Sequence, residues 1–519
     1  MIRRIVKIIR NLPALLAVLS GLSAEARPFL PDGGMPGNRD VPPQTTALTG
    51  AEMTLDEAIA AARTRSVQAL EAKQAFISAY WAWRAWQASR LPSLHLYGNL
   101  MDFNRSLTLL QNPDDGAMKY VGTHNLQNGL GLQAVQNIAF TGGTLSVSSD
   151  LNRIDQFGTD RNLTWYAQPL TVSYRQPLFA YNPFKWDRRI EPKEYEKSRR
   201  AYLEAMEEVT VRAVGAYFSL VVARQEEERA RNHHRDIRQM CAIAGERLRL
   251  GSITRGEYLQ LELRLLNDSI AVNETAVRVR EAQMELNSLL GFDELYEIVP
   301  VLEEDLPDLV MDESAVADRA FRNSRFGLDN EIALLRAGAA VAKARSERGV
   351  TMSLNARFGL SRSGPSLPDA WRNPPDQEVV GLSFSIPIFD WGLGRGRIQK
   401  ALAAEEVVKA QVQQSENDWR RHICTVVGQL NNQRWQCAVS RRATDIAAER
   451  YALVTERFRT GAATVTELNT ARAESDAARQ QHVTDISNFW HYYYALRQYT
   501  LYDFIRGKDL EIDEDEILE

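Results

Sequence analysis

The segments YRQPLF at residues 174–179 and FSIPIF at residues 384–389 lie at an offset of 210 residues (384 minus 174) and share their aromatic ends and central proline. A second pair, ERLRLG at 246–251 and ERFRTG at 456–461, recurs at the same offset of 210 residues. The first pair is typical of a strand and the second of a helix, so the intervening chain has one length in both copies. Repetition at a fixed offset indicates a duplicated supersecondary unit. We therefore predict one domain built of two structural halves.

The N-terminal residues 1–26 have the pattern of a secretory signal. Four basic residues lie within the first ten, an apolar stretch runs from Leu12 to Leu22, and Ala24-Glu25-Ala26 fits the small-residue cleavage pattern. An amphipathic N-terminal helix is the alternative interpretation. The first Cys is Cys241, far from the cleavage point, so we expect no lipid anchor.

Composition narrows the class of protein. The net charge of -5 gives no reason to expect nucleic acid as a partner. Cys424 and Cys437 fall on one predicted helix about 20 Å apart, whereas a disulfide needs Cα atoms within about 7 Å. We therefore predict that they and Cys241 are structural thiols. After the signal no apolar run approaches the ~18 residues of a membrane-spanning helix, so an exported chain of this kind is either soluble or a β-barrel.

Alternation of apolar and polar residues predicts strands in both halves. In the second half, Leu354 and Phe358 alternate with Asn355 and Arg357. A period of two indicates a strand with one apolar and one polar face, although an ordinary half-buried sheet has the same pattern. We predict strands at about 93–105, 166–179, 351–362 and 378–389.

The first half is longer than the second between its strands. Arg90 corresponds to Arg348, an offset of 258, so 48 extra residues (258 minus 210) lie between about Leu94 and Pro177. They include a hairpin pattern at about 129–151. This hairpin either adds strands to the sheet or forms an extracellular flap, and the sequence leaves both open.

Long helical hairpins follow each strand pair. Helices of about 64 residues, predicted at Trp186–Leu250 and Arg397–Thr460, would each be about 95 Å long. A heptad ladder of mostly apolar residues along the second indicates side-by-side helix packing. Glycine-centred tips at 250–256 and 460–466 lead into returning helices, Thr254–Leu290 and Thr464–Phe504. Each returning helix begins with a Thr-x-x-Glu capping box, as does an earlier helix predicted from Thr54 to Leu91.

These patterns divide the chain into six segments. They are a signal peptide 1–26, a flexible segment 27–52, a first repeat 53–290, a connector 291–311, a second repeat 312–504 and an acidic tail 505–519, which we expect to be partly disordered.

The strand count favours assembly. Two halves give four core strands, and an open sheet in lipid would leave backbone groups unpaired at its edges. Bacterial barrels have at least ~8 strands, so at least two chains would be needed, and the long helices would continue the barrel as a tube.

At this point the chain resembles the TolC-like outer-membrane efflux proteins, over about Thr54 to Phe504. The junction PIFDWG at 387–392 looks like the family's strand-to-helix signature, whereas the first copy, PLFA at 177–180, lacks the following Asp and Gly. Both tips match the family's Arg-x-x-x-Gly hairpins. The resemblance implies a fold that is mainly α with a membrane β-barrel: a homotrimer with a 12-strand barrel continuous with a periplasmic α-helical barrel. It also implies docking to a periplasmic adaptor that links the channel to an inner-membrane transporter.

The resemblance assigns candidate site residues. The candidate strand-to-helix junctions are Pro177, Pro387 and Gly392. The candidate adaptor-docking tips are Arg247, Gly251, Arg457 and Gly461. The candidate periplasmic gate consists of Glu467, Thr470, Glu257 and Gln260. In the family, two acidic residues after the second tip ring the closed entrance, and here the second of these positions is Thr470. Alternatively, Glu467 is only the capping partner of Thr464, and the tip arginines are solvated charges at helix ends.

Other classes of function are disfavoured. The segment GLGRG at 392–396 is not a dinucleotide fingerprint, and His233-His234 has no third ligand nearby, so we predict no enzyme activity, cofactor or metal. A periplasmic adaptor or coiled-coil scaffold without a pore is the main alternative. A secreted enzyme on a helical stalk is a weaker one, because 48 extra residues are too few for a catalytic domain.

Overall fold

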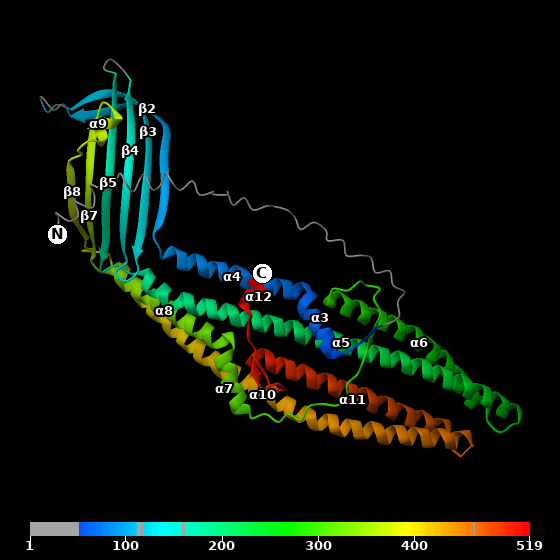
Figure 1. Ribbon diagram of the computed structural model, residues 1–519. Coiled ribbons are helices and arrows are strands. Elements are labelled where there is room, and N and C mark those ends of the chain that lie inside the picture. Colours follow the sequence, from blue (N-terminus) through cyan, green and yellow to red (C-terminus); the bar gives the residue numbers. More distant parts are fainter. Residues whose placement is uncertain (1–50, 112–115, 117, 158–160, 461, 519) are drawn as a thin grey trace. The chain divides into compact units, whose positions relative to one another are not determined.

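The structure, a computed structural model, describes residues 51–111, 116, 118–157, 161–460 and 462–518 (Figure 1). The predicted signal 1–26 and residues 27–50 of the predicted flexible segment lie outside the described residues.

The two long helical hairpins have matching bounds. Helices α5 (Pro183–Arg249) and α10 (Leu393–Arg459) both contain 67 residues. Their returning partners, α6 (Arg255–Leu290) and α11 (Val465–Thr500), both contain 36. Every bound in the second hairpin lies 210 residues after its counterpart (393 minus 183, for example). The predicted repeat is therefore visible in the helices themselves, and each long helix extends for about 100 Å.

The predicted helix from Thr54 to Leu91 is two helices. They are α3 (Leu55–Arg65), which begins with the predicted Thr54 capping box, and α4 (Val67–Ser89). Ser66 separates them because its ψ of 149° is extended and its hydroxyl caps α4 by accepting from the Ala69 amide at 3.1 Å. The second repeat has the same break, 258 residues later, at Ser324 between α7 (Glu313–Asn323) and α8 (Arg325–Arg348).

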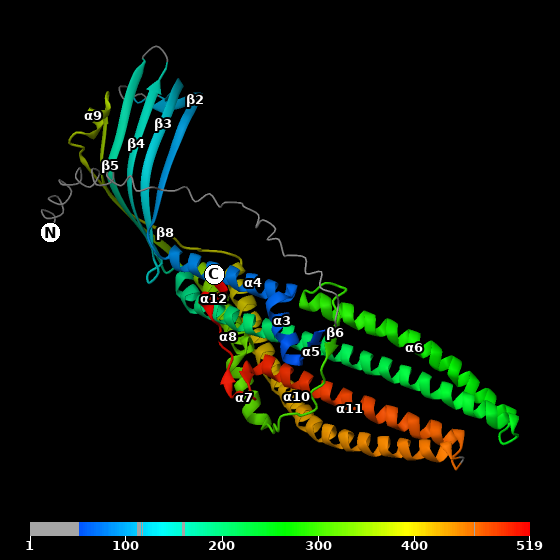
Figure 2. The same cartoon turned by 45° about the vertical axis from the view of Figure 1, so that its right-hand side comes forward.

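One antiparallel sheet contains six strands in the order β2-β3-β4-β5-β7-β8 (Figures 1 and 2). The strands are β2 (Ser93–Gln111), β3 (Met118–Ile138), β4 (Gly143–Gln156), β5 (Asn162–Leu178), β7 (Thr351–Gly364) and β8 (Asp376–Ser385), with the short helix α9 (Leu367–Trp371) before β8. The extra hairpin is longer than predicted and adds two strands between β2 and β5. The expected 12-strand barrel presupposes four strands per chain, and the described sheet has six, with free edges at β2 and β8.

The helical core is formed where the helices of both repeats pack together. Its largest fully buried side chains include Tyr217, Leu286, Ile423 and Phe489. The predicted heptad ladder of α10 is buried from Ile423 to Cys437. The Tyr217 hydroxyl lies 2.9 Å from the Met53 carbonyl oxygen and 2.7 Å from that of Val301.

Through these two contacts, Tyr217 binds the chain at the ends of two short strands, which lie in segments predicted as connectors. Strand β1 (Ala51–Met53) pairs in parallel with β6 (Ile298–Pro300). The end of the segment expected to be flexible, and the middle of the connector 291–311, therefore form a small sheet.

The C-terminal tail is folded rather than partly disordered. Strands β9 (Tyr502–Asp503) and β10 (Lys508–Asp509) form a hairpin, and α12 (Glu514–Leu518) follows. Glu514 accepts a hydrogen bond from the Tyr195 hydroxyl at 2.9 Å and forms an ion pair with Arg199 at 2.8 Å. These charge-assisted contacts place the acidic tail against α5.

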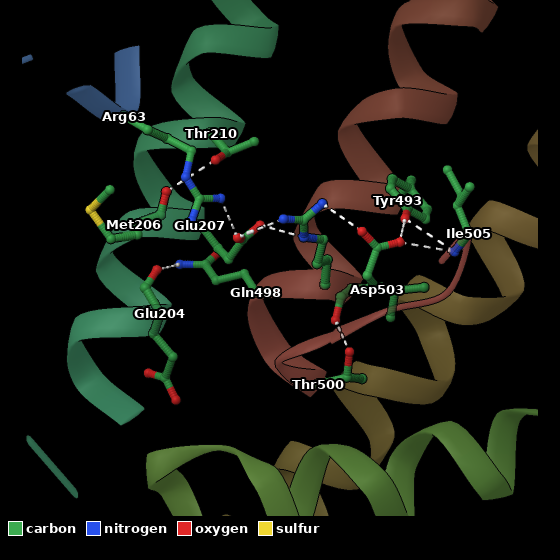
Figure 3. Close-up of polar contacts among 12 residues, drawn as sticks. Arg63, Glu204, Met206, Glu207, Thr210, Tyr493, Gln498, Thr500, Asp503 and Ile505 are labelled. Atoms are coloured by element: carbon green, nitrogen blue, oxygen red, sulfur yellow. Dashed lines mark hydrogen bonds and ion pairs between the residues drawn. The ribbon is translucent and has the colours of Figure 1, made fainter. Parts of the chain in front are cut away.

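A buried ionic network joins the tail to the helices (Figure 3). The fully buried Glu207 forms ion pairs with Arg63 at 2.8 Å and Arg497 at 3.0 Å. Arg497 also contacts Asp503 at 3.2 Å, and the Tyr493 hydroxyl donates to Asp503 at 2.8 Å. Burial by itself raises the pKa of Asp503, but hydrogen bonds from the Arg506 amide and Tyr493, with the charge of Arg497, outweigh it and lower the pKa. A buried carboxylate is tolerable only when paired in this way.

Candidate functional site at the helical tips

The two tips are closed by the same backbone hydrogen bond. The Ser252 amide donates to the Arg247 carbonyl at 2.9 Å, and the Ala462 amide donates to the Arg457 carbonyl at 2.8 Å. This six-to-one bond is the Schellman closure of a helix end. Gly251 supplies the left-handed residue it requires, with φ of +70°. Gly461 lies outside the described residues.

The two glutamates of the candidate gate cap the returning helices. The Thr254 amide donates to the Glu257 carboxylate at 2.8 Å, and the Thr464 amide donates to the Glu467 carboxylate at 3.0 Å. Both glutamates are exposed. Hydrogen bonds from the Thr254 amide and hydroxyl lower the pKa of Glu257. Within one chain, the geometry therefore supports the capping role of each.

The other two gate candidates are also on the surface. Gln260 is exposed, and so is Thr470, whose hydroxyl donates to the Thr466 carbonyl at 3.0 Å. Over the described residues, no hydrogen bond joins one of the four gate candidates to another. A constriction formed by them would therefore need further copies of the chain.

The tip arginines have different partners. Arg457 donates to the Ala462 carbonyl at 3.0 Å, which caps its own tip. Arg247 donates instead to the Arg459 carbonyl at 3.1 Å, on the other hairpin. Cationic donors at a helix C-terminus are favourable in both cases. The Arg247 contact also holds the two tips next to each other.

A buried ion pair that the sequence patterns do not predict joins the two hairpins. Asp268 of α6 and Arg472 of α11 lie 3.3 Å apart, and their side chains are only 8% and 9% exposed. Arg264, one turn before Asp268, adds a second contact to its carboxylate at 3.0 Å. Because both members are buried, the pair has a defined geometry that an exposed ion pair would lack.

A second contact between the hairpins lies one turn further along α11. The His233 imidazole Nε2 lies 2.9 Å from the Asp476 carboxylate, and Arg229 donates to the Asp476 carbonyl at 3.2 Å. Burial raises the pKa of Asp476, but the hydrogen bond to His233 and the charges of His233, Arg229 and Arg472 outweigh it, so the pKa is lowered. The carboxylate is therefore held ionised between α5 and α11.

The repeat gives no signal for these residues. All four members of the two pairs fall where the repeats differ, as most positions of these helices do. The counterparts of His233, Asp268, Arg472 and Asp476, 210 residues away, are Ala443, Ala478, Glu262 and Leu266. The two contacts are therefore not repeated between the hairpins, and only the structure identifies them.

The strand-to-helix junctions differ between the repeats. In the second, which follows Pro387, the Asp390 carboxylate accepts from the amides of Gly392 at 2.9 Å and Gly394 at 2.7 Å. These bonds lower the pKa of Asp390, and Gly392 has a left-handed φ of +86°. In the first, Pro177 is still part of β5, opposite Ser353.

In the first junction the residue equivalent to Gly392 is Asn182, the N-cap of α5. Its side chain makes no cap and instead donates to the Ala139 carbonyl at 3.1 Å. The first junction therefore binds the turn of the additional hairpin.

The described residues contain no group of three or more His, Cys, Asp or Glu residues arranged to hold a metal ion. In the described part of the chain, no helix combines the length and the hydropathy that a membrane crossing requires.

Comparison with known proteins finds a family match in both repeats. A profile of the family described as outer membrane efflux protein matches residues 137–292 and 326–500. The alkaline protease secretion protein AprF of Pseudomonas aeruginosa is 24% identical over 302 residues, which cover 56% of this chain and 60% of the relative. Protein CyaE of Bordetella pertussis is 25% identical over 292 residues, covering 56% of this chain and 61% of the relative. The chain thus spans about 60% of the length of these curated relatives.

Solved structures share the fold. The CmeC outer membrane channel of Campylobacter jejuni superposes with a TM-score of 0.62 at 15% identity, covering 89% of this chain and 88% of CmeC. The outer membrane protein VceC of Vibrio cholerae gives a TM-score of 0.59 at 14% identity, covering 86% of this chain and 95% of VceC. At these identities the likeness concerns the fold alone.

Proposed function

Because the chain belongs to the outer membrane efflux protein family, we propose that it is the outer-membrane channel of a tripartite efflux or secretion system. It would conduct substrates from a periplasmic adaptor and an inner-membrane transporter to the outside. The family and its solved relatives are outer-membrane channels, not enzymes. The channel needs no cofactor in this proposal, because its energy comes from the inner-membrane partner.

The observation that carries the proposal is the equal length of the hairpins. The 67-residue and 36-residue helices recur at one offset, and Arg247 of one tip contacts the backbone of the other. Two tips at one level can dock on a single partner. The chain also contains a six-stranded sheet with free edges. A scaffold without a pore would not require such a sheet.

Those edges favour a homotrimer as the assembly. In outer-membrane lipid, the edges at β2 and β8 have to be paired, and pairing β8 of one copy with β2 of the next satisfies both. The helices of three copies would then surround a periplasmic tunnel, so a large portion of the chain lies in the periplasm. No lipid anchor is needed to hold such an assembly.

We also propose a polypeptide as the cargo. The relative AprF is named for the secretion of an alkaline protease. An unfolded polypeptide is polar along its backbone, and the polar face of the sheet would present hydroxyl, amide and charged groups to it. Small-molecule export is the alternative.

The entrance of the tunnel would be the tips. Glu467 and Thr470, with Glu257 and Gln260 of the first repeat, would face the axis of the trimer, where repelling carboxylates narrow the opening. The Asp268–Arg472 pair would hold α6 and α11 together in the closed state.

Fractionation of cells that produce the full chain tests the proposal. We expect recovery in the outer membrane as an oligomer that resists dissociation in detergent until it is heated. Recovery as a monomer in the soluble periplasmic fraction would contradict the channel and favour the scaffold.

A further inference from the structure

We propose that the hairpin β3–β4 is a lipid-facing part of the membrane barrel, so that three copies close a barrel of 18 strands (3 × 6) instead of 12. The inference rests on the proposed channel function and deepens it, because it sets the width of the exit and the surface that meets the lipid.

The hairpin is fully paired inside the sheet. Strand β3 pairs with β2 from Ser93↔Val135 to Gln111↔Met118, and with β4 from Ile138↔Gly143 to Asn125↔Gln156. Strand β4 then pairs with β5, whereas β2 and β5 are not neighbours. If the hairpin left the sheet, β2 and β5 would lose all of these pairings and would have to pair directly with each other. Unpaired backbone groups in hydrocarbon cost several kcal/mol each.

The hairpin shares the apolar face of the other strands. One row of directly opposed residues is apolar across five strands, and on the sixth strand, β8, it ends at Glu378. Its apolar members are Leu94, Ala134, Val147, Val172 and Phe358. Directly opposed residues lie on the same face of a sheet. Leu94 is 66% exposed and Phe358 46%, so the described chain leaves apolar side chains of this row uncovered.

The adjacent row lies on the opposite face and has no large apolar member. It consists of His95, Gln133, Ser148, Thr171 and Gly359. An apolar outer face and a polar inner face are the pattern of a membrane barrel with a wet lumen. An extracellular flap would not need to continue both rows in register with the membrane strands.

A contact on the polar face ties the hairpin to the first strand. Tyr97, Gly131 and Asp150 form one row across β2, β3 and β4. The Tyr97 hydroxyl donates to the Asp150 carboxylate across Gly131. A side chain at Gly131 would collide with the tyrosine ring, so the glycine allows this bridge.

The turn of the hairpin is fixed at the helical end of the sheet, where Figure 2 shows β3 and β4 running beside β2 and β5. Gln176 donates to the Thr141 carbonyl at 2.8 Å and Asn182 to the Ala139 carbonyl at 3.1 Å. On the other side, Gln136 donates to the Arg90 carbonyl at the end of α4 at 2.9 Å. The turn is therefore bound to the helix that enters the sheet and to the helix that leaves it. A flap on the outer side would have its turn at the opposite end.

The strand number sets the exit width. With strands about 4.8 Å apart and tilted by about 40°, 12 strands give a backbone diameter of about 24 Å and 18 strands about 36 Å. Subtracting about 10 Å for inward side chains leaves about 14 Å and about 26 Å. A helix with its side chains is about 10–12 Å wide. The wider exit admits a polypeptide that has already formed a helical hairpin, whereas the narrower one admits a single helix.

Fluorescence quenching by brominated lipids tests this placement. Single cysteines are introduced into a background carrying Cys241→Ala, Cys424→Ala and Cys437→Ala, labelled with a small fluorophore, and reconstituted in vesicles with brominated acyl chains. The test positions are Leu132→Cys and Val147→Cys, on the apolar face of the hairpin. The matched controls are the next residues, Gln133→Cys and Ser148→Cys, and Leu382→Cys of β8 serves as the membrane standard.

We expect the labels at 132 and 147 to be quenched as strongly as the label at 382, and the labels at 133 and 148 to be quenched several-fold less. If the labels at 132 and 147 are unquenched while the label at 382 is quenched, the hairpin lies outside the bilayer and the 18-strand barrel is wrong, although the channel stands. If the label at 382 is also unquenched, the proposed channel itself fails. A cryo-EM count of 12 strands in the trimer would overturn the inference independently.

Discussion

Breaking the Asp268–Arg472 pair should loosen the contact between the two hairpins near their tips. The substitution Asp268→Asn leaves Arg472 buried without its carboxylate, whereas Arg472→Gln leaves Asp268 with its second partner, Arg264. The two substitutions are therefore expected to be unequal, although they remove the same contact.

The burial of the pair sets the expected loss of stability. Removing one member of a buried ion pair costs about 3–5 kcal/mol, because the other charge stays buried without compensation. We expect about 3 kcal/mol for Asp268→Asn and about half of that for Arg472→Gln, because Arg264 still compensates Asp268. The double substitution leaves no unpaired charge, so its cost should fall well below the sum. Arg264→Gln is the matched control: its side chain is 47% exposed, and an exposed partner contributes about 1 kcal/mol or less.

Hydrogen exchange of the reconstituted protein measures the effect locally. A loss of about 3 kcal/mol corresponds to about 100-fold faster exchange of the amides of α6 and α11 around the pair. Exchange in the strands should be unchanged. Equal effects of the two single substitutions, or a double variant whose cost equals their sum, would refute the reasoning that an uncompensated buried charge is what destabilises.

Three further predictions concern the same regions. The pKa of Asp476 is lowered, so its stabilising contribution is present above the unfolded-state Asp value of about 3.9 and is lost as the pH falls through the lower folded-state pKa. Protection of α11 should therefore fall in acid, and the fall should be smaller in Asp476→Asn than in the wild type. Glu467→Ala should raise single-channel conductance, and Glu57→Ala, which removes the same kind of cap at the start of α3 and away from the tips, is its matched control. Equal effects of the two substitutions would leave only a capping role. Asp390→Ala removes the acceptor for two backbone amides, so exchange at the start of α10 should accelerate while the start of α5, which has no such Asp, is unaffected.

The repeat made the helices predictable. A fixed offset and two Thr-x-x-Glu boxes defined the long hairpins to within a few residues, because those signals are local. The breaks at Ser66 and Ser324 were missed, because a serine in an apolar periodic stretch is compatible with a helix, and only its extended ψ ends one. The end of α11 at Thr500, before the predicted Phe504, depends likewise on the left-handed conformation of Leu501.

The remaining differences have tertiary causes. The place of the hairpin between β2 and β5 depends on pairing between distant strands, which alternation alone does not specify. The acidic tail looked disordered by composition, but Arg199 compensates Glu514 of the tail, and Arg497 and Tyr493 bind Asp503 just before it. The Asp268–Arg472 pair joins residues 204 apart, and no local pattern in the sequence marks either position.

Conductance in planar lipid bilayers tests the central claim most directly. The purified full chain, added to one side of the bilayer, should insert as a trimer and produce discrete conductance steps. Variants of the Asp268–Arg472 pair should open more often than the wild type. A protein that inserts as an intact oligomer but produces no steps, in the wild type and in these variants alike, would contradict the account of this chain as a channel.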